Sequence, residues 1–537
     1  MMTDFNDIWD SIEASKTDGM TISEYKNYVL GFLFYRYLSF NQEQYLLKNN
    51  VLDINGKETI NEAYLREAVD SDLDDYLDDI SSSLGYAISP TDTWKSLITK
   101  INDDTLKAGD YQEIFDNFNK NAKLNKDATS YFDGIFDDVD IRNSRLGDST
   151  TSKAMSLTKL VKMIDEFDFE NSADNFHHLF EELIEQFANK SDKGGGEFYT
   201  PHSVSTLLSK LVTDGLAPSD KTFTGYDMAS GSGSTLLALK DEVPGGTRPG
   251  AVKLYGTEKE LTTYNLSRMN LLLGGMSYKN TKLLNHDTLS SDWPDGPDTN
   301  GTDHPRTFDA VVSDIKFSAE WDNSDSRMKD PRFNEYGKLA PKKTADYAFV
   351  LHGLYHLDEE GTMAMVLPHG ILFRGNAAGT IRKNLIEHHS GNRVYAVIGL
   401  PENIMFSEPH KKSVAVTIVV FKKKRDTNDI LFIDAKDDFA KGKNRNYLRD
   451  SDINKIVEAY HNRQNTDKYA HLASMEEIRK NEYNLNISRY VDTFEKEVPI
   501  NLNQVNQSLE KYDKQISALQ TEINKNLTLL GVKKDIK

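Results

Sequence analysis

Residues 224–240 read TGYDMASGSGSTLLALK and contain the turn that decides the fold. A strand is followed by Gly231, Ser232 and Gly233, and an apolar helix begins directly after them. Glycine lets the backbone turn sharply and approach a ligand closely, and the start of a helix offers free N–H groups. By itself this pattern is a weak signal of ligand binding, because a glycine turn between a strand and a helix is often only a turn.

Beyond Gly194 the chain alternates short apolar runs of β type with helical segments. The runs are FTGYDMA, VKLYGTE, TKLLNHD, FDAVVSD, GTMAMVLP, RVYAVIGL and VAVTIVVFKK. This alternation predicts an α/β domain with a mostly parallel sheet. The last two runs are expected to form an antiparallel edge of that sheet.

Acidic residues stand at the ends of the two strands that follow the glycine turn. Glu258 ends one strand, where its carboxylate is suited to accept hydrogen bonds from both ribose hydroxyls of an adenosine-type cofactor. Asp287 follows the next strand and is suited to accept from an adenine amino group. Taken singly, each acid is as well explained as a solvated residue or a helix cap. Because ligands of open α/β sheets bind at the carboxyl ends of the strands, the serial arrangement favours a cofactor site.

Composition limits the class of protein. The 537 residues suit two or three domains, and the most apolar stretch, Tyr28–Phe40, is interrupted by Arg36 and falls short of a membrane span. The first residues lack the pattern of a secretory signal and the chain has no cysteine, so a cytoplasmic protein without a soft metal site is expected. The net charge of -20 repels the phosphate backbone of a nucleic acid. If nucleic acid is the substrate, we expect another chain to supply much of the grip.

Helical patterns lie on both sides of the α/β region. From Phe5 to about Glu170 the apolar residues recur at helical spacing, and Thr21 with Glu24 forms a capping box. The acidic run from Asp70 is interpreted as a solvated helix face. The expected domains are a helical N-terminal domain at 1–165, an α/β domain at 166–490 and a helical tail at 491–537.

The tail carries a heptad pattern with alternating spacings of four and three. Its apolar members are Val505, Leu509, Tyr512, Ile516, Leu519, Ile523, Leu527 and Leu530. A lone helix cannot bury such a stripe, so it packs either on this chain's own body or on a partner helix. The pattern alone leaves both arrangements open.

Several further motifs identify a family resemblance. They are GGGEFYTPHSVSTLLSKLV, YDMASGSGSTLL, LYGTEKELTTYNLSRMNLLLGG, LLNHDTL, ADYAFVLHGL, GTMAMVLPHGILFRG, VIGLPENIMF and YNLNISRYVDTFE. Together they resemble the modification (methyltransferase) subunit of type I restriction-modification systems, from the helical N-terminal domain almost to the C-terminus. The resemblance implies an S-adenosylmethionine (SAM) dependent, Rossmann-like methyltransferase domain with its motifs in the order typical of adenine-N6 enzymes.

By this resemblance, eleven residues contact the cofactor. The segment Glu197, Phe198, Tyr199, Thr200 and Pro201 is expected to surround the methionine end of SAM. The other expected contacts are Asp227, Ser230, Gly231 and Gly233 at the turn, Glu258 at the ribose and Asp287 at the adenine ring.

The catalytic loop departs from the family. Where the family carries an asparagine, two prolines and an aromatic residue, this chain has Asp314, Ile315, Lys316 and Phe317. Asp314 and the Ile315 carbonyl still offer acceptors for the target amino group, and Phe317 still offers a ring to stack on the extruded base. The stiffness that two prolines impose on the backbone is absent. Three readings follow: an active enzyme with an altered loop, a SAM-binding subunit without methyl transfer, and a chain altered on purpose at this loop.

A second departure lies at Ser407–Phe421. His410, Lys411 and Lys412 replace a threonine-rich turn of the family, either as a small basic patch facing DNA or as a solvated turn.

The resulting prediction is an adenine-N6 DNA methyltransferase subunit of a type I complex that acts on double-stranded DNA. The resemblance implies a separate specificity subunit that selects the site, a second copy of this chain and a restriction subunit. The alternative is a catalytically impaired scaffold that holds the specificity subunit on DNA. The helical N-terminal domain is expected to contact DNA or the second methyltransferase copy.

Overall fold

The structure is a computed structural model of the whole chain. It describes residues 5–17, 19–69, 72–107, 109–167, 176–190, 199–290, 306–407, 412–443, 445–493 and 502–531. The chain divides into two compact units, Met1–Val491 and Asp492–Lys537. The domain boundary expected at residue 165 lies inside the first unit and stays a prediction.

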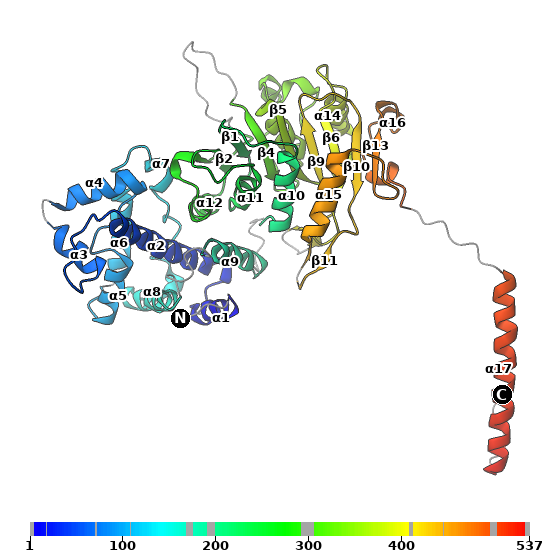
Figure 1. Cartoon of the computed structure of the whole chain (residues 1–537), viewed down its shortest axis with the longest axis horizontal. Helices are drawn as coiled ribbons and strands as arrows, with labels where there is room; N and C mark the ends of the chain where they lie inside the picture. Colours follow the sequence, from blue (N-terminus) through cyan, green and yellow to red (C-terminus); the bar gives the residue numbers. More distant parts are fainter. Residues whose placement is uncertain are drawn as a thin grey trace. The chain divides into compact units, whose positions relative to one another are not determined.

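A nine-stranded sheet is the centre of the first unit, in the order β13-β10-β6-β9-β5-β4-β1-β2-β3 within the described residues (Figure 1). The strands are β1 (Phe223–Asp227), β2 (Val252–Glu258), β3 (Thr281–Asn285), β4 (Phe308–Asp314), β5 (Leu357–Pro368), β6 (Val394–Gly399), β9 (Val416–Lys422), β10 (Ile430–Asp434) and β13 (Ala470–Ala473). Strands β3, β2, β1, β4 and β5 are parallel to one another. The predicted α/β fold with a mostly parallel sheet is confirmed.

The place of the last two predicted runs in the sheet differs from the prediction. Strands β6 and β9 pair antiparallel, as expected, and β9 is also antiparallel to β5. Their expected position at the sheet edge is wrong, because β10 pairs parallel with β6 and β13 then pairs with β10. The apolar residues of β6 and β9 are therefore covered on both faces and by neighbouring strands on both sides.

Helices cover both faces of the sheet. Ala310 and Val312 of β4 pack into one layer with α10 (His202–Thr213), α11 (Ser234–Glu242) and α15 (Asp450–Asn462). Val311 points to the opposite layer, which contains α13 (Asp346–Tyr355), α14 (Asn376–Ile386) and α16 (Met475–Lys480). The alternation follows from the two-residue period of a strand. Helices α10 and α15 lie in front of the strands in Figure 1.

The N-terminal region is helical, as predicted. Its helices are α1 (Phe5–Ser15), α2 (Ile22–Lys48), α3 (Ile60–Glu67), α4 (Asp72–Leu84), α5 (Trp94–Asn102), α6 (Asp110–Asn121), α7 (Thr129–Phe132), α8 (Thr150–Asp165) and α9 (Phe176–Lys190). The predicted capping box opens α2, with Thr21 N–H donating to Glu24 at 2.9 Å. Helix α4 buries Leu77 and Ile80 and exposes its aspartates, which confirms a solvated acidic face. None of the described helices combines the length and apolar character that crossing a membrane requires.

The core of the helical region continues onto α12 (Leu261–Leu273), which follows β2. Leu266, Met269 and Leu273 of α12 belong to the same buried cluster as the N-terminal helices. The Tyr131 hydroxyl donates to the Arg268 carbonyl at 2.6 Å, and the Arg268 guanidinium donates to the Tyr131 carbonyl at 2.8 Å. Helix α12 is therefore shared between the helical region and the sheet.

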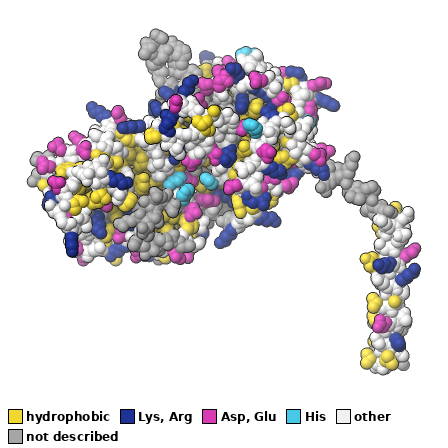
Figure 2. All heavy atoms as spheres, viewed as in Figure 1, with side chains coloured by type: hydrophobic (Ala, Val, Ile, Leu, Met, Phe, Trp, Pro, Cys, Tyr) yellow, Lys and Arg dark blue, Asp and Glu magenta, His cyan; other side chains and the backbone are white. Residues whose placement is uncertain are grey.

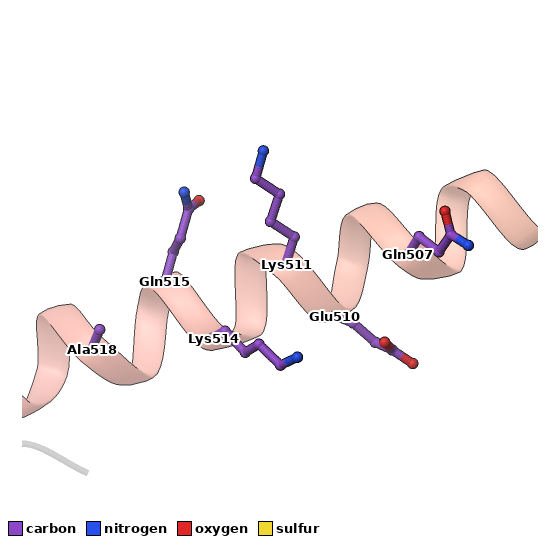
Figure 3. Close-up of a pocket in the computed structure, with 6 residues that line it drawn as sticks. All are labelled: Gln507, Glu510, Lys511, Lys514, Gln515 and Ala518. Carbon is purple, nitrogen blue, oxygen red and sulfur yellow. The ribbon is translucent and has the colours of Figure 1, made fainter.

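The second unit contains α17 (Leu502–Leu529), and none of its described residues is buried. The predicted apolar stripe is present and exposed along the helix; Leu519, for example, is 58% exposed. Figure 2 shows these hydrophobic side chains between charged ones on the C-terminal helix. A hollow lined by Gln507, Lys511, Gln515 and their neighbours lies along one side of this same helix (Figure 3), so it is a groove between exposed side chains and not an enclosed site.

Candidate active site

The turn after β1 has the geometry that its glycines predict. Gly231 and Gly233 have φ of 54° and 82°, in the left-handed region that favours glycine. A Cβ on Gly233 would lie 2.8 Å from Ser267 Oγ on α12. Gly233 is the N-cap of α11 and provides no side-chain cap. The first N–H groups of α11 are therefore available to a polar or anionic ligand group.

Asp227, at the end of β1, directly precedes this turn. It is 1% exposed, and its Oδ1 accepts from Ala229 N–H at 3.0 Å and from the Ser313 hydroxyl at 2.7 Å. Burial raises the pKa of this carboxyl to about 7. The first hydrogen bond stabilises the start of the turn, and the second connects β1 to β4.

The acid at the end of β2 is bonded to the turn itself. Glu258 Oε2 accepts from Gly231 N–H at 3.1 Å, and its Oε1 accepts from Glu260 N–H at 2.8 Å. Burial raises the pKa of Glu258. A carboxylate has about four acceptor sites. Both oxygens therefore retain capacity for hydroxyl donors of a ligand in the turn.

Asp287 lies after β3, the strand next to β2 in the sheet. Its Oδ2 accepts from Lys259 Nζ at 3.0 Å, and its Oδ1 accepts from Leu289 N–H at 3.0 Å. The side chain is 38% exposed. Asp287 thus has a local capping role and an ion pair, and it still presents part of its carboxylate to solvent at this edge of the site.

The segment before α10 reaches the end of β4. Glu197 and Phe198 lie outside the described residues. Tyr199 is buried, and Pro201 is the N-cap of α10. Between them, Thr200 donates through Oγ1 to Asp314 Oδ2 at 2.8 Å. The segment expected at the methionine end of a cofactor is therefore in direct contact with the catalytic loop.

The catalytic loop begins in the core. Asp314 is 7% exposed, and its Oδ1 has no hydrogen-bond partner within the described part of the chain. Burial raises the pKa of this carboxyl to about 7, whereas the hydrogen bond from Thr200 lowers it. Ile315 is fully buried, Lys316 is exposed, and Phe317 is half-buried against both helical layers.

Contacts further along hold the loop that lacks the two prolines. Ser318 has φ of 54°, and its N–H donates to Asp346 Oδ1 at 2.9 Å. Asp346, the first residue of α13, also pairs with Arg374 at 3.3 Å. Together with the burial of Ile315, this anchor restricts the backbone without proline.

For the second departure from the family, at Ser407–Phe421, His410 and Lys411 lie outside the described residues. Only the backbone of Lys412 is described, and it pairs with Ser407.

Glu181 of α9 is a site residue that sequence reasoning missed. Its carboxylate accepts from Ser234 Oγ at 2.7 Å, from Tyr199 Oη at 3.3 Å and from the side-chain amide of Asn270. It therefore joins α9 to the glycine turn, to α12 and to the segment before α10. A single glutamate on an amphipathic helix gives no signal of this role in a sequence.

The sheet order, the glycine turn and the strand-end acids define the fold of the SAM-dependent methyltransferases. The sequence matches the N-6 DNA Methylase family over residues 171–498 and the HsdM N-terminal domain over residues 6–164. It is 34% identical to the type I restriction enzyme MpnII methylase subunit of Mycoplasma pneumoniae, over 93% of this chain and 91% of that protein. This chain belongs to the N-6 DNA methylase family, as a methyltransferase subunit of type I restriction-modification systems.

Other relatives agree with this assignment. The type I restriction enzyme HindI methylase subunit of Haemophilus influenzae is 29% identical over 66% of this chain and 78% of that protein. The structure of the type I restriction-modification system methyltransferase subunit from Streptococcus thermophilus matches with a TM-score of 0.80 and 38% identity. That match covers 91% of this chain and 99% of the other. The predicted membership in the methyltransferase subunits of type I restriction-modification systems is confirmed.

Proposed function

We propose that this subunit is an active enzyme that transfers a methyl group from S-adenosyl-L-methionine to N6 of adenine in double-stranded DNA. The observation that carries the proposal is Oδ1 of Asp314, a buried acceptor at the carboxyl end of β4 that has no hydrogen-bond partner among the described residues. An unpartnered buried carboxylate oxygen is costly, and such atoms concentrate at functional sites. An adenine amino group is a donor that would satisfy it.

The residues at the neighbouring strand ends fit the cofactor. SAM supplies an electrophilic methyl group on a sulfonium ion. Gly231 and Gly233 give the turn its left-handed backbone, which leads to the free N–H groups at the start of α11. Glu258 offers acceptors to the ribose hydroxyls, and Asp287 is the proposed acceptor for the adenine amino group. Ser230 and Asp227 shape the turn. Tyr199 and Pro201, together with Glu197 and Phe198, which lie outside the described residues, are the proposed contacts to the methionine end.

The catalytic loop supplies the contacts to the base. Asp314 Oδ1 and the Ile315 carbonyl accept the two N6 hydrogens, which directs the nitrogen lone pair toward the methyl group. The base must leave the DNA stack to reach them, and Phe317 offers a ring on which it can stack. Stacking on an aromatic side chain contributes about 1–3 kcal/mol per base.

The alternative is a scaffold that binds SAM without methyl transfer. Its support is the Asp314-Ile315-Lys316 run, which lacks the stiffness of two prolines. The buried Ile315 and the bond from Ser318 to Asp346 favour the active reading, because they restrict the same stretch of backbone.

The test is to map N6-methyladenine across the genome of a methylation-free host that expresses this chain with the specificity subunit encoded beside it. Modified adenines at one split motif, lost in Asp314→Ala, would support the proposal. If the intact complex binds SAM and modifies no adenine, the scaffold reading replaces it.

We further propose that the specificity subunit packs on the apolar stripe of α17. The complex would also contain a second copy of this chain and, for cleavage, a restriction subunit. The net charge of -20 is unfavourable for DNA binding by this chain alone. Exposed apolar stripes on a helix are a common docking surface. Ile516→Asp should abolish co-purification with the specificity subunit, whereas Gln515→Asp, outside the stripe, should retain it; equal retention would refute this surface.

A further inference from the structure

We infer that Thr200 is a positioning residue that fixes the Asp314 carboxyl through Oδ2 and leaves Oδ1 for the target amino group. This inference rests on the proposed methyl transfer. It differs from the role at the methionine end of SAM that the family resemblance implies for Thr200. Thr200 and Asp314 lie 114 residues apart, so the contact depends on how the segment before α10 packs against the end of β4.

The number of protons that Thr200 can donate distinguishes between holding Asp314 and contacting the methionine end of SAM. A threonine hydroxyl has one proton to donate. Thr200 gives that proton to Asp314 Oδ2 at 2.8 Å, so it has none left for the methionine carboxylate of a cofactor. The other carboxylate oxygen, Oδ1, is buried without a partner in the described residues. One oxygen of Asp314 is therefore held and the other is free.

The orientation matters for the reaction. The N6 lone pair forms the new N–C bond as the C–S bond of the sulfonium breaks, and the electron pair of that bond stays on sulfur. The methylated nitrogen then carries an extra proton, which it loses to a base. An ionised Asp314 can accept a hydrogen bond from N6 through Oδ1 and take this proton. A misplacement of a reacting group by about 1 Å can cost on the order of 100-fold in rate. Fixing the plane of the Asp314 carboxyl therefore affects the rate of methyl transfer directly.

The charged groups around Asp314 do not hold its carboxyl as Thr200 does. Asp227 on β1 is a buried carboxyl that repels it, and the Ser313 hydroxyl donates to Asp227 at 2.7 Å. Lys316 is exposed. On α13, Asp346 accepts from the loop backbone at Ser318. Among the described residues, the hydrogen-bond donor to the Asp314 side chain is thus Thr200.

Thr200→Val removes the donor with little change in size, and Thr200→Ser restores it. Thr206→Val is the matched control, because Thr206 lies on α10 and its hydroxyl donates to the His202 carbonyl at 3.0 Å. The full chain with its specificity subunit is assayed for kcat across the neutral pH range. SAM affinity is measured separately by calorimetry.

We expect Thr200→Val to lower kcat by about 10- to 100-fold, the range for one lost hydrogen bond to a charged group. The acidic limb of its kcat profile should move to higher pH, because the lost bond stabilised the ionised Asp314. SAM affinity should stay within about twofold of the wild type, and Thr200→Ser should recover both rate and profile. Thr206→Val should behave as the wild type.

A Thr200→Val variant with weakened SAM binding and an unmoved pH profile would overturn the inference, as would one with unchanged kcat. If the wild-type complex binds SAM and methylates nothing, the proposed function fails by itself. The inference is then decided by infrared titration of the Asp314 carboxyl, assigned with Asp314→Asn. Thr200→Val must raise its titration midpoint, and an unmoved midpoint would refute the role of Thr200.

Discussion

Glu181 of α9 accepts a hydrogen bond of 2.7 Å from Ser234 Oγ, the first residue of α11, across 53 residues of sequence. The carboxylate also accepts from Tyr199 and from the buried amide of Asn270. The helix before the methyltransferase motifs is thereby attached to the turn that is proposed to hold the cofactor. The position of α9 and the shape of the turn are coupled through this one side chain.

Glu181→Ala should weaken SAM binding. Ser234 and Asn270 lose a shared acceptor, which corresponds to about 1 kcal/mol, or roughly fivefold in Kd. Calorimetric titration of SAM into the full chain gives the value. Glu182→Ala is the control, since Glu182 is adjacent and exposed. Equal Kd values for both variants would show that the turn does not depend on Glu181.

Asp314→Asn should change how stability depends on pH. Burial raises the pKa of Asp314 from about 3.8 in an unfolded chain to about 7 in the folded chain. Between these values the folded state keeps a proton that the unfolded state releases. Its stabilising effect is therefore full below about pH 4 and is lost as the pH rises through about 7.

The variant should match the wild type near pH 4 and exceed it above pH 7, by up to about 4 kcal/mol in the free energy of unfolding. Urea unfolding at the two pH values measures this difference. Part of the pH dependence should remain, because burial also raises the pKa of Asp227 to about 7. Identical pH slopes for variant and wild type would contradict the burial of an ionisable Asp314.

Asp346→Ala should slow methyl transfer without weakening SAM binding. It removes the acceptor that Ser318 N–H contacts at 2.9 Å, so the loop after Asp314 loses its anchor. We expect kcat to fall by about 10- to 100-fold. Asp322→Ala is the control from the same loop, because Asp322 is 61% exposed. A fall of the same size in the control would assign the effect to general loop disturbance.

Two deletions should differ in their effect on stability. Removing residues 1–150 uncovers the apolar side of α12, including Leu266 and Met269, and breaks the Tyr131 contact with Arg268. That variant should aggregate, so loss of DNA or partner binding after this deletion would not prove a direct contact. Removing residues 492–537 takes away a separate compact unit and should leave the melting temperature of the first unit within about 2 °C, the shift that corresponds to less than about 1 kcal/mol in a domain of this size. Size-exclusion chromatography and thermal unfolding check both.

The sequence by itself determined the local elements and their order. The capping box at Thr21 and the glycines at 231 and 233 act through near neighbours, so local spacing was enough to predict them. The acids at the ends of β2 and β3 stand out by their positions at strand ends, although Glu258 accepts from Gly231, 27 residues away. The heptad stripe of α17 follows from helical periodicity in the same way. The family motifs added the predicted cofactor and reaction, because they are specific in combination.

Only the tertiary structure decided which of these residues meet. It placed β9 inside the sheet instead of at its edge, connected Asp227 to Ser313, and brought Thr200 to Asp314 and Glu181 to Ser234. A hydrogen bond between residues 114 apart depends on the packing of a whole sheet between two helical layers. No local pattern contains that information, since the partner of a side chain at a strand end is set by the element that folds beside it.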